Sequence, residues 1–295
     1  MRCDLASPSL PGRSGPRAPR APDTFVDVPT VTRLAQYRDD RGNEIVYTGV
    51  IEEQIRIKFT GRNNRLVVAG TVRLRELRVD FDCNNGMVEI ASSTGVPAFS
   101  AAIRVGQNST VRIGQNVSST AIVAMSAVER TEIVVGDDVM FASENQVRTD
   151  DGHPIFDGRT GKRVNVSKTI RIGNHVWLAR MSTVLGGAEI GDGSVIGYGT
   201  IVTKRIPNNC VAAGVPARVV RRDAAWERPH LSLDLPYYKP DASTVSKSSY
   251  WNLTAPEPAA PTRAHRIRRK LGGSGLRRML QNRRRLGSST PRKAS

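Results

Sequence analysis

A six-residue repeat constrains this chain more than any other feature of its sequence. Aliphatic residues follow one another at intervals of six, and a small or β-branched residue comes four positions after each of the first five. A period of six matches neither a helix, which repeats after about 3.6 residues, nor a simple strand, which repeats after two. It fits a short strand followed by a corner, with three corners closing one triangular coil. The aliphatic positions are Ile172, Leu178, Val184, Ile190, Ile196 and Val202, and the small ones are Val176, Ser182, Ala188, Ser194 and Thr200.

Coils of this kind must stack, because a single coil cannot bury its own apolar face. The first residue of each hexad then points inward, and the fifth lies at a tight corner. Hydrophobic residues make up 39% of the chain and aromatic residues only 5%, which favours a core of Val, Ile and Ala. The same phase occurs at Val135, Phe141 and Val147, and again at Val105 and Val111. We therefore predict an all-β, parallel β-helix fold, with a right-handed solenoid or an irregular β-sandwich as the alternatives.

The composition divides the chain into four regions. Residues 1–44 are rich in Pro and Arg and are expected to be mostly disordered, and residues 45–222 form the β-helix. Residues 223–259 form an aromatic extension that we expect to pack on the helix, and residues 260–295 form a basic, largely disordered tail. Within the helix, Val147 and Ile172 are 25 rather than 24 positions apart, so a loop leaves it over about residues 148–171.

Charge and cysteine content exclude several classes of protein. The chain has a net charge of +17, but residues 260–295 carry +12 and residues 1–22 carry +3, so the body between them is nearly neutral. No run of 18 apolar residues predicts a membrane-spanning helix, and the N-terminus lacks the apolar segment of a secretory signal. Three widely spaced cysteines (Cys3, Cys83 and Cys210) form no disulfide framework. We expect a soluble protein in the cytoplasm.

Three segments resemble a known family. They are Thr149–Asp157 (TDDGHPIFD), Gly173–Trp177 (GNHVW) and Ile206–Val220 (IPNNCVAAGVPARVV). Together with the hexads, they resemble the hexapeptide-repeat acyltransferases, in particular the branch that O-acetylates sugars and capsular polysaccharides. The resemblance implies a left-handed β-helix, acetyl-CoA as co-substrate, no metal, a sugar or glycan acceptor, and a homotrimer.

The same resemblance assigns a catalytic residue. In the family, the histidine of the Asp-x-His or Gly-His-Pro segment is the general base, and the matching residue is His153. Acyl transfer to a hydroxyl needs a base that works near neutral pH, which is the range of histidine. Without the resemblance, a single loop histidine is usually solvated. Asp151 is our candidate for orienting His153, although Asp150 and Asp157 remain alternatives, and each can equally be a turn-forming residue.

Other residues are candidates for substrate binding. By resemblance, Trp177 lines the groove, where its indole can stack on a sugar ring; packing against the loop or a neighbouring subunit is the alternative. Asn145 and Asp150 are placed with it as acceptor contacts, and His175 is expected to be structural.

The donor brings phosphates, which require cations and close approach of the backbone. The candidate residues near the last coils are Gly187, Lys204, Gly214, Ala217 and Arg218. Surface charges are often only solvated, which is the alternative for Lys204 and Arg218.

The basic tail has no part in this chemistry. Residues 263–285 alternate arginines with aliphatic residues and can adsorb to an anionic membrane, bind nucleic acid without specificity, or act as a solubilising tail. Our hypothesis is adsorption to the inner face of the membrane, with no specific nucleic acid partner.

The sequence therefore predicts an acetyl-CoA-dependent O-acetyltransferase that acts on a sugar hydroxyl of a polysaccharide or its lipid-linked precursor. Acetylation of a serine or a xenobiotic hydroxyl remains an alternative within enzymes. A non-catalytic β-helix scaffold, anchored by its basic tail, is the alternative from another class. A γ-class carbonic anhydrase is set aside because it needs three zinc-binding histidines, and only His153 and His175 lie in the coils.

Overall fold

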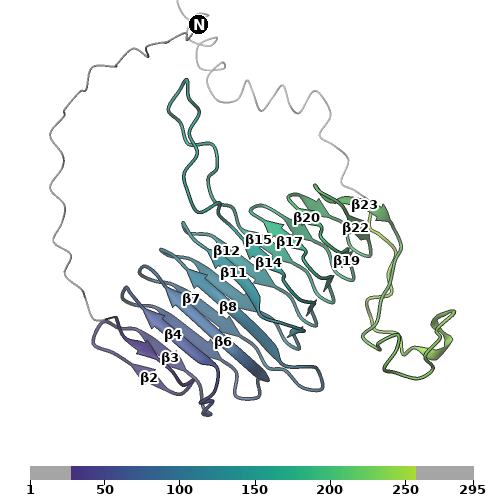
Figure 1. Ribbon diagram of the computed structural model, residues 1–295, viewed down its shortest axis with the longest axis horizontal. Helices are drawn as coiled ribbons and strands as arrows, with labels where there is room; N and C mark the ends of the chain where they lie inside the picture. Colours follow the sequence, from purple (N-terminus) through teal and green to yellow (C-terminus); the bar gives the residue numbers. More distant parts are fainter. Residues whose placement is uncertain (1–27, 257–295) are drawn as a thin grey trace, which may run out of the picture.

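The computed structural model describes residues 28–256 as one parallel β-helix with a projecting loop and a C-terminal extension (Figure 1). The tail at residues 260–295 and the first 27 residues lie outside the described part, and so do the predictions made for them. Within residues 28–256, no helix is long and apolar enough to cross a membrane.

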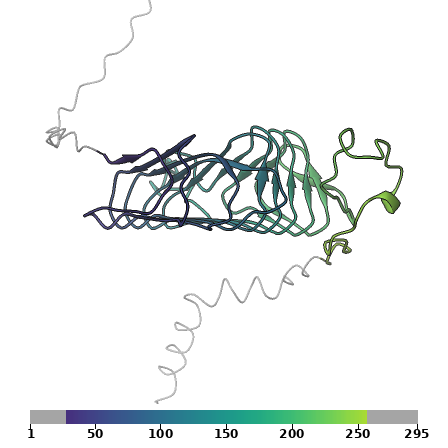
Figure 2. The same ribbon diagram turned by 90° about the horizontal axis from the view of Figure 1, so that it is seen from below.

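The coils form three sheets along the long axis of the molecule, which we number sheets 1 to 3 (Figure 2). Neighbouring strands within each sheet are parallel, except for one antiparallel pair at one end of each sheet. Sheet 1 contains β1 (Thr30–Val31), β4 (Ile55–Phe59), β6 (Leu74–Phe81), β8 (Phe99–Val105), β11 (Val123–Ala127), β14 (Gln146–Arg148), β17 (Thr183–Leu185) and β20 (Ile201–Val202). Sheet 2 contains β2 (Tyr37–Arg38), β3 (Glu44–Val46), β5 (Arg65–Val68), β7 (Met87–Ile90), β9 (Thr110–Ile113), β12 (Glu132–Val135), β15 (Ile170–Ile172), β18 (Glu189–Ile190) and β21 (Arg205–Ile206). Sheet 3 contains β10 (Ser118–Ser119), β13 (Met140–Phe141), β16 (Trp177–Leu178), β19 (Val195–Ile196), β22 (Val211–Ala213) and β23 (Arg218–Arg221).

The hexads fold as predicted. Val184 pairs with Val202 and Ile172 with Ile190, each 18 positions further on, so three hexads make one coil. All six aliphatic positions from Ile172 to Val202 are buried, and the predicted parallel β-helix is confirmed.

The coils nearer the N-terminus are longer. Val111 pairs with Ile133, 22 positions further on, which removes the hexad phase there. The interior of these coils is mostly aliphatic but also holds phenylalanine rings, and Phe59 and Phe81 stack with their centroids 5.1 Å apart. The sequence-based expectation of an aliphatic core did not include these rings, for which a wider coil leaves room.

Order also begins earlier than expected. We predicted disorder as far as residue 44, but β1 pairs antiparallel with β4, and Leu34 is fully buried. The reason is that the open end of the first coil would expose its core, and Leu34 covers it. The predicted boundary at residue 45 is too late.

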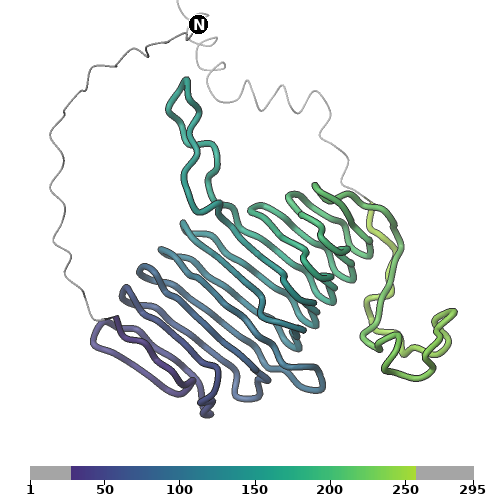
Figure 3. Tube along the Cα trace, in the orientation of Figure 1, coloured from purple at the N-terminus to yellow at the C-terminus, as the bar shows by residue number. Residues whose placement is uncertain are grey.

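A loop projects from the helix between β14 and β15, at residues 149–169 (Figure 3). Val147 pairs with Val184, 37 positions further on, so this coil holds 19 residues more than a coil of three hexads. The loop leaves where each coil turns from sheet 1 into sheet 2, an edge that we call the 1–2 edge.

The chain after β23 turns back along sheet 3. Trp226 is buried against the coils, whereas the following residues stand away from the end of the helix and include the short 3-10 helix η1 (Ala242–Thr244) (Figure 1). This extension brings Trp226 and Tyr250 onto the outer face of sheet 3, where they pack on His175.

Candidate functional site

A hollow of about 320 Å³ lies on the 1–2 edge, at the base of the projecting loop. Three successive coils and the loop contribute to its wall, so residues far apart in the sequence meet there. The lining residues are Cys83, Arg104, Gly106, Gln107, Val128, Glu129, Asp150, Gly152, His153, Pro154 and Arg163.

His153 is exposed in this hollow, and its backbone is held from across the loop. The side-chain amide of Asn165 donates to the His153 carbonyl at 2.8 Å, and its oxygen accepts from the Ile155 N–H at 2.7 Å. The imidazole itself makes no hydrogen bond within residues 28–256. Its two ring nitrogens are therefore available to a bound molecule.

The two neighbouring carboxylates act on the loop and not on the imidazole. Asp150 is almost fully buried, and it accepts from the Ser126 hydroxyl at 2.7 Å and from the Gly152 N–H at 2.8 Å. The Asp151 carboxylate accepts from the Asn165 amide at 2.9 Å. The structure thus places Asp150 in the wall of the hollow, and gives neither residue a contact with the His153 ring that would orient it.

An ion pair fastens the loop to the coil below it. The Glu129 carboxylate binds the Arg163 guanidinium and accepts from the Ser167 hydroxyl at 2.6 Å. The hydrogen bond from Arg163, followed by that from Ser167, lowers the pKa of Glu129 to about 2. Glu129 is therefore ionised at every pH at which the protein would be assayed, and the base of the loop stays tied down.

Sequence analysis missed Glu129 and Arg163, as well as Arg104 and Cys83. Arg104 and Cys83 lie in the long N-terminal coils, where the hexad phase is lost. Arg104 pairs with Ser126, and Ser126 pairs with Arg148. These three residues form one column along sheet 1 that ends at the base of the loop. A repeat search with a period of 22 would have placed Arg104 and Ser126 in that column.

The predicted donor-binding residues lie on both edges of sheet 1. Gly187 is on the 1–2 edge one coil above the loop, and Lys204 follows it on the next coil. Gly214 and Ala217 are on the opposite edge, where the Ala217 N–H donates to the Ile201 carbonyl at 2.8 Å, and Arg218 begins β23 beside them.

The 1–2 edge above the loop fits a phosphate-bearing chain. Gly187 has a φ of +87°, and a Cβ there would lie 3.1 Å from the Lys168 side chain. Lys168 and Lys204 are both exposed, one on each side of this glycine. Two cations beside a bare stretch of backbone are the groups that a pyrophosphate needs.

Trp177 and Asn145 lie outside the hollow. Trp177 is in β16 on sheet 3, where its ring packs on Trp226 with centroids 5.9 Å apart. Asn145 is buried inside the coil and donates to the Ala179 carbonyl and the Ser182 hydroxyl, both at 2.8 Å. The prediction that Asn145 contacts the acceptor is therefore wrong, because the corner position it occupies points inward. Trp177 thus has a packing partner on the C-terminal extension, Trp226.

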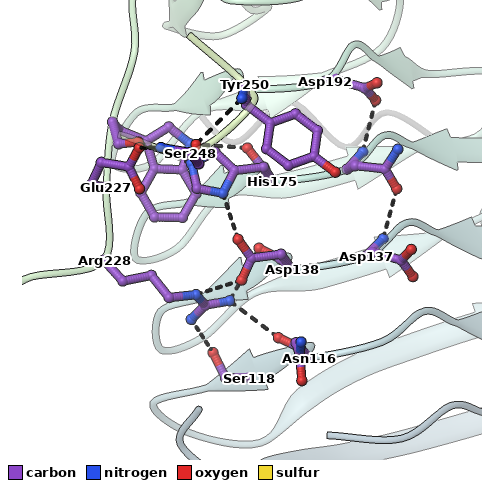
Figure 4. Close-up of polar contacts among 12 residues, drawn as sticks. Asn116, Ser118, Asp137, Asp138, His175, Asp192, Glu227, Arg228, Ser248 and Tyr250 are labelled. Atoms are coloured by element: carbon purple, nitrogen blue, oxygen red, sulfur yellow. Dashed lines mark hydrogen bonds and ion pairs between the residues drawn. The ribbon is translucent and has the colours of Figure 1, made fainter. Parts of the chain in front are cut away.

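His175 holds that extension in place (Figure 4). Its Nδ1 lies 2.6 Å from the Asp138 carboxylate and its Nε2 lies 2.9 Å from the Trp226 carbonyl. Both partners only accept hydrogen bonds, so both ring nitrogens carry a proton and the imidazole is a cation. The ring is stacked between Trp226 and Tyr250, with centroids 4.2 and 4.9 Å away.

Asp138 completes this cluster, which we call the His175 clamp. Its other carboxylate oxygen accepts from Arg228 Nε at 2.6 Å, and Arg228 also donates to the Ser118 hydroxyl at 2.8 Å. Burial opposes the charge on both partners, but the hydrogen bond between them, the Trp226 carbonyl and the charge of Arg228 together outweigh it, so the pKa of His175 is raised and that of Asp138 is lowered. The structural role expected for His175 is thus the docking of the extension.

Comparison with known protein families gives a match to the bacterial transferase hexapeptide (six repeats) over residues 169–204. This segment covers the uninterrupted hexads. Among residues 28–256, no cluster of three or more His, Cys, Asp or Glu side chains is arranged to hold a metal ion.

Two curated relatives extend the similarity. A polysialic acid O-acetyltransferase of Escherichia coli O1:K1 / APEC is 34% identical over 124 residues, which is 42% of this chain and 38% of the relative. A galactoside O-acetyltransferase of Escherichia coli (strain K12) is 40% identical over 113 residues, or 38% of this chain and 54% of the relative. The chain thus spans about half or less of the length of these two relatives.

One solved structure resembles most of the β-helix. The crystal structure of the polySia-specific acetyltransferase NeuO is similar with a TM-score of 0.57 and 32% sequence identity. The match covers 67% of this chain and 84% of that one.

Proposed function

Since the chain belongs to the hexapeptide-repeat acyltransferase family, we propose that it transfers an acetyl group from acetyl-CoA to a hydroxyl group of a sugar. The observation that carries the proposal is the imidazole of His153, which has no hydrogen-bond partner among the described residues and lies in a hollow of about 320 Å³. The Asn165 side chain holds the backbone in place at that residue and at Ile155, two positions further on.

In the proposed reaction, His153 takes the proton of the acceptor hydroxyl while the hydroxyl oxygen attacks the thioester carbonyl. A C–O bond forms and the C–S bond breaks. The proton passes to the departing thiolate, which leaves an acetyl ester and a free thiol. No acyl-enzyme is required, and Asp151 contributes by holding Asn165 and, through it, the loop.

The acceptor that we propose is a glycan or its lipid-linked precursor. Its support is that the relatives named above are O-acetyltransferases of polysialic acid and of galactosides. We further propose a cytoplasmic homotrimer whose basic tail, residues 263–285, lies against the anionic inner face of the membrane.

The test of this proposal is the product. The full chain, incubated with acetyl-CoA and a panel of glycans that includes polysialic acid and galactosides, is expected to give a glycan with an alkali-labile acetyl ester, identified by NMR. Acetylation of serine or of a xenobiotic alcohol in place of every glycan would contradict the proposed acceptor class.

The donor site gives a separate prediction. Replacing Lys168 and Lys204 together by Gln is expected to raise the KM for acetyl-CoA about tenfold, because two phosphate-binding cations are removed. The KM for the glycan and the kcat should change little. Lys58, at the far end of sheet 1, provides the matched control when replaced by Gln. An unchanged KM for acetyl-CoA in the double variant would place the donor elsewhere.

A further inference from the structure

A loop at the end of the β-helix exposes an unusual number of apolar side chains. We call residues 229–239 the apolar lobe; it stands off the last coils and is well separated from the His153 loop (Figures 1 and 2). Its five large apolar and aromatic side chains are between 64% and 79% exposed. They are Leu231, Leu233, Leu235, Tyr237 and Tyr238.

Several backbone groups of the lobe are hydrogen-bonded by its own side chains. The Lys239 ammonium donates to three carbonyls of the same loop, those of His230, Asp234 and Pro236, at 3.2, 2.7 and 2.8 Å. The Asp234 carboxylate accepts from the His230 N–H at 2.6 Å. Because the hydrogen bonds of the lobe are made internally, its apolar side chains are left facing outward by the fold of the loop itself.

The lobe is also firmly attached. Arg228, directly before it, is bound to Asp138 and Ser118, and Trp226 is buried on His175 (Figure 4). The apolar side chains are therefore presented from a fixed base.

The strongly basic part of the sequence starts from the same end of the molecule. The Thr254 N–H donates to Asp223 at 2.7 Å, and the Ala255 N–H donates to Asn208 at 2.8 Å, so the described chain ends against the last coil. The residues that follow, 257–295, include 12 Lys and Arg and one acidic residue. The apolar lobe and the point where the cationic sequence begins thus both lie toward the C-terminal coils of the β-helix.

We propose that this end of the molecule docks on an anionic lipid bilayer, with the apolar lobe inserted at the level of the headgroups. Leucines beside a tyrosine pair suit the boundary between headgroups and acyl chains, and the cationic residues in the sequence after residue 256 would add attraction to anionic lipid. A contact between two copies of the chain is the alternative occupant, and the oligomeric mass of the lobe variant distinguishes it.

The test is co-sedimentation of the full chain with vesicles of phosphatidylcholine, with and without phosphatidylglycerol. The lobe variant carries Leu231→Ser, Leu233→Ser and Leu235→Ser. The control variant carries Val164→Ser and Val166→Ser, which are 61% and 59% exposed on the other projecting loop. We expect the wild type and the control to bind anionic vesicles alike, and the lobe variant to bind at least about tenfold more weakly.

The salt dependence of vesicle binding distinguishes the contribution of the lobe from that of the basic tail. Raising the salt concentration weakens the electrostatic attraction of the tail to the vesicles, whereas the apolar contribution of the lobe persists. The ratio of the vesicle affinity of the wild type to that of the lobe variant should therefore be maintained. Because the lobe side chains are exposed, thermal unfolding of the variant should match that of the wild type.

Three results would overturn the proposal. The first is absence of wild-type binding to anionic vesicles, and the second is equal binding by the wild type and the lobe variant. The third is a change in oligomeric mass of the lobe variant in sedimentation velocity, which would make the lobe a contact between copies.

Discussion

Replacing His153 by Ala is expected to lower acetyl transfer by a factor of about 10² to 10⁴, the range contributed by a positioned general base. The loss should appear in kcat, because the imidazole acts on the proton that moves in the transition state. Stability should not change, since the ring makes no hydrogen bond within the described residues. The measurement is thiol release from acetyl-CoA, with thermal unfolding followed in parallel.

Asp151 provides the matched comparison. Its carboxylate accepts a hydrogen bond from Asn165 and has no contact with the imidazole, so Asp151→Asn retains an acceptor and should cost less than about tenfold in kcat. A loss as large as that of His153→Ala would show that Asp151 acts directly on the base. Full activity of His153→Ala would remove His153 from the mechanism.

Replacing Asp138 by Asn is expected to lower the free energy of unfolding by about 2–3 kcal/mol, because His175 and Arg228 each lose a charged hydrogen-bond acceptor. Both cations then face a neutral amide in a half-buried site. The extension should loosen, and the fluorescence of Trp226, which is stacked on His175, should report it. Chemical unfolding followed by tryptophan fluorescence measures both effects.

The His175 clamp also has a predicted pH dependence. The pKa of His175 is raised, because hydrogen bonds to Asp138 and the Trp226 carbonyl outweigh burial, and the nearby Glu227 adds to the effect. Its contribution to stability is complete below the ordinary imidazole pKa of about 6.5 and is lost as pH rises through the raised value.

The contribution of Asp138 to stability depends on pH in the opposite direction. Its pKa is lowered, because the hydrogen bonds from His175 and Arg228 outweigh burial, so its contribution is complete above about 3.9 and is lost as pH falls through the lowered value. The extension is thus held most firmly between mildly acidic and neutral pH. Alkaline pH should loosen the wild type more than Asp138→Asn, and an identical pH dependence of the two proteins would contradict the clamp.

The fold was predictable where the coil length is constant. From Ile172 to Val202 each coil is three hexads, so inward positions recur at a fixed interval and need no knowledge of the rest of the chain. In the longer N-terminal coils the spacing between paired residues is larger, 22 for Val111 and Ile133 instead of 18, and phenylalanine rings join the aliphatic columns. Those coils could be placed only by the pairing between strands.

The candidate site was predictable in part, for a similar reason. His153 belongs to a recognisable local segment, whereas Glu129 and Arg163 are brought together by an insertion of 19 residues within one coil, and no local pattern links them. For Asn145, the sequence suggested a site residue that the structure does not place in the site. Its place beside the loop in the sequence suggested a contact with substrate, but the corner geometry points it into the core.

The most direct test of the account is the rate of thiol release from acetyl-CoA by the full wild-type chain, with and without each glycan of the panel. Acetyl transfer at the 1–2 edge predicts that at least one glycan accelerates release well above the rate in water alone, and that this acceleration is absent in His153→Ala. Release that no glycan accelerates, or a glycan-dependent rate that is the same in His153→Ala, would contradict it.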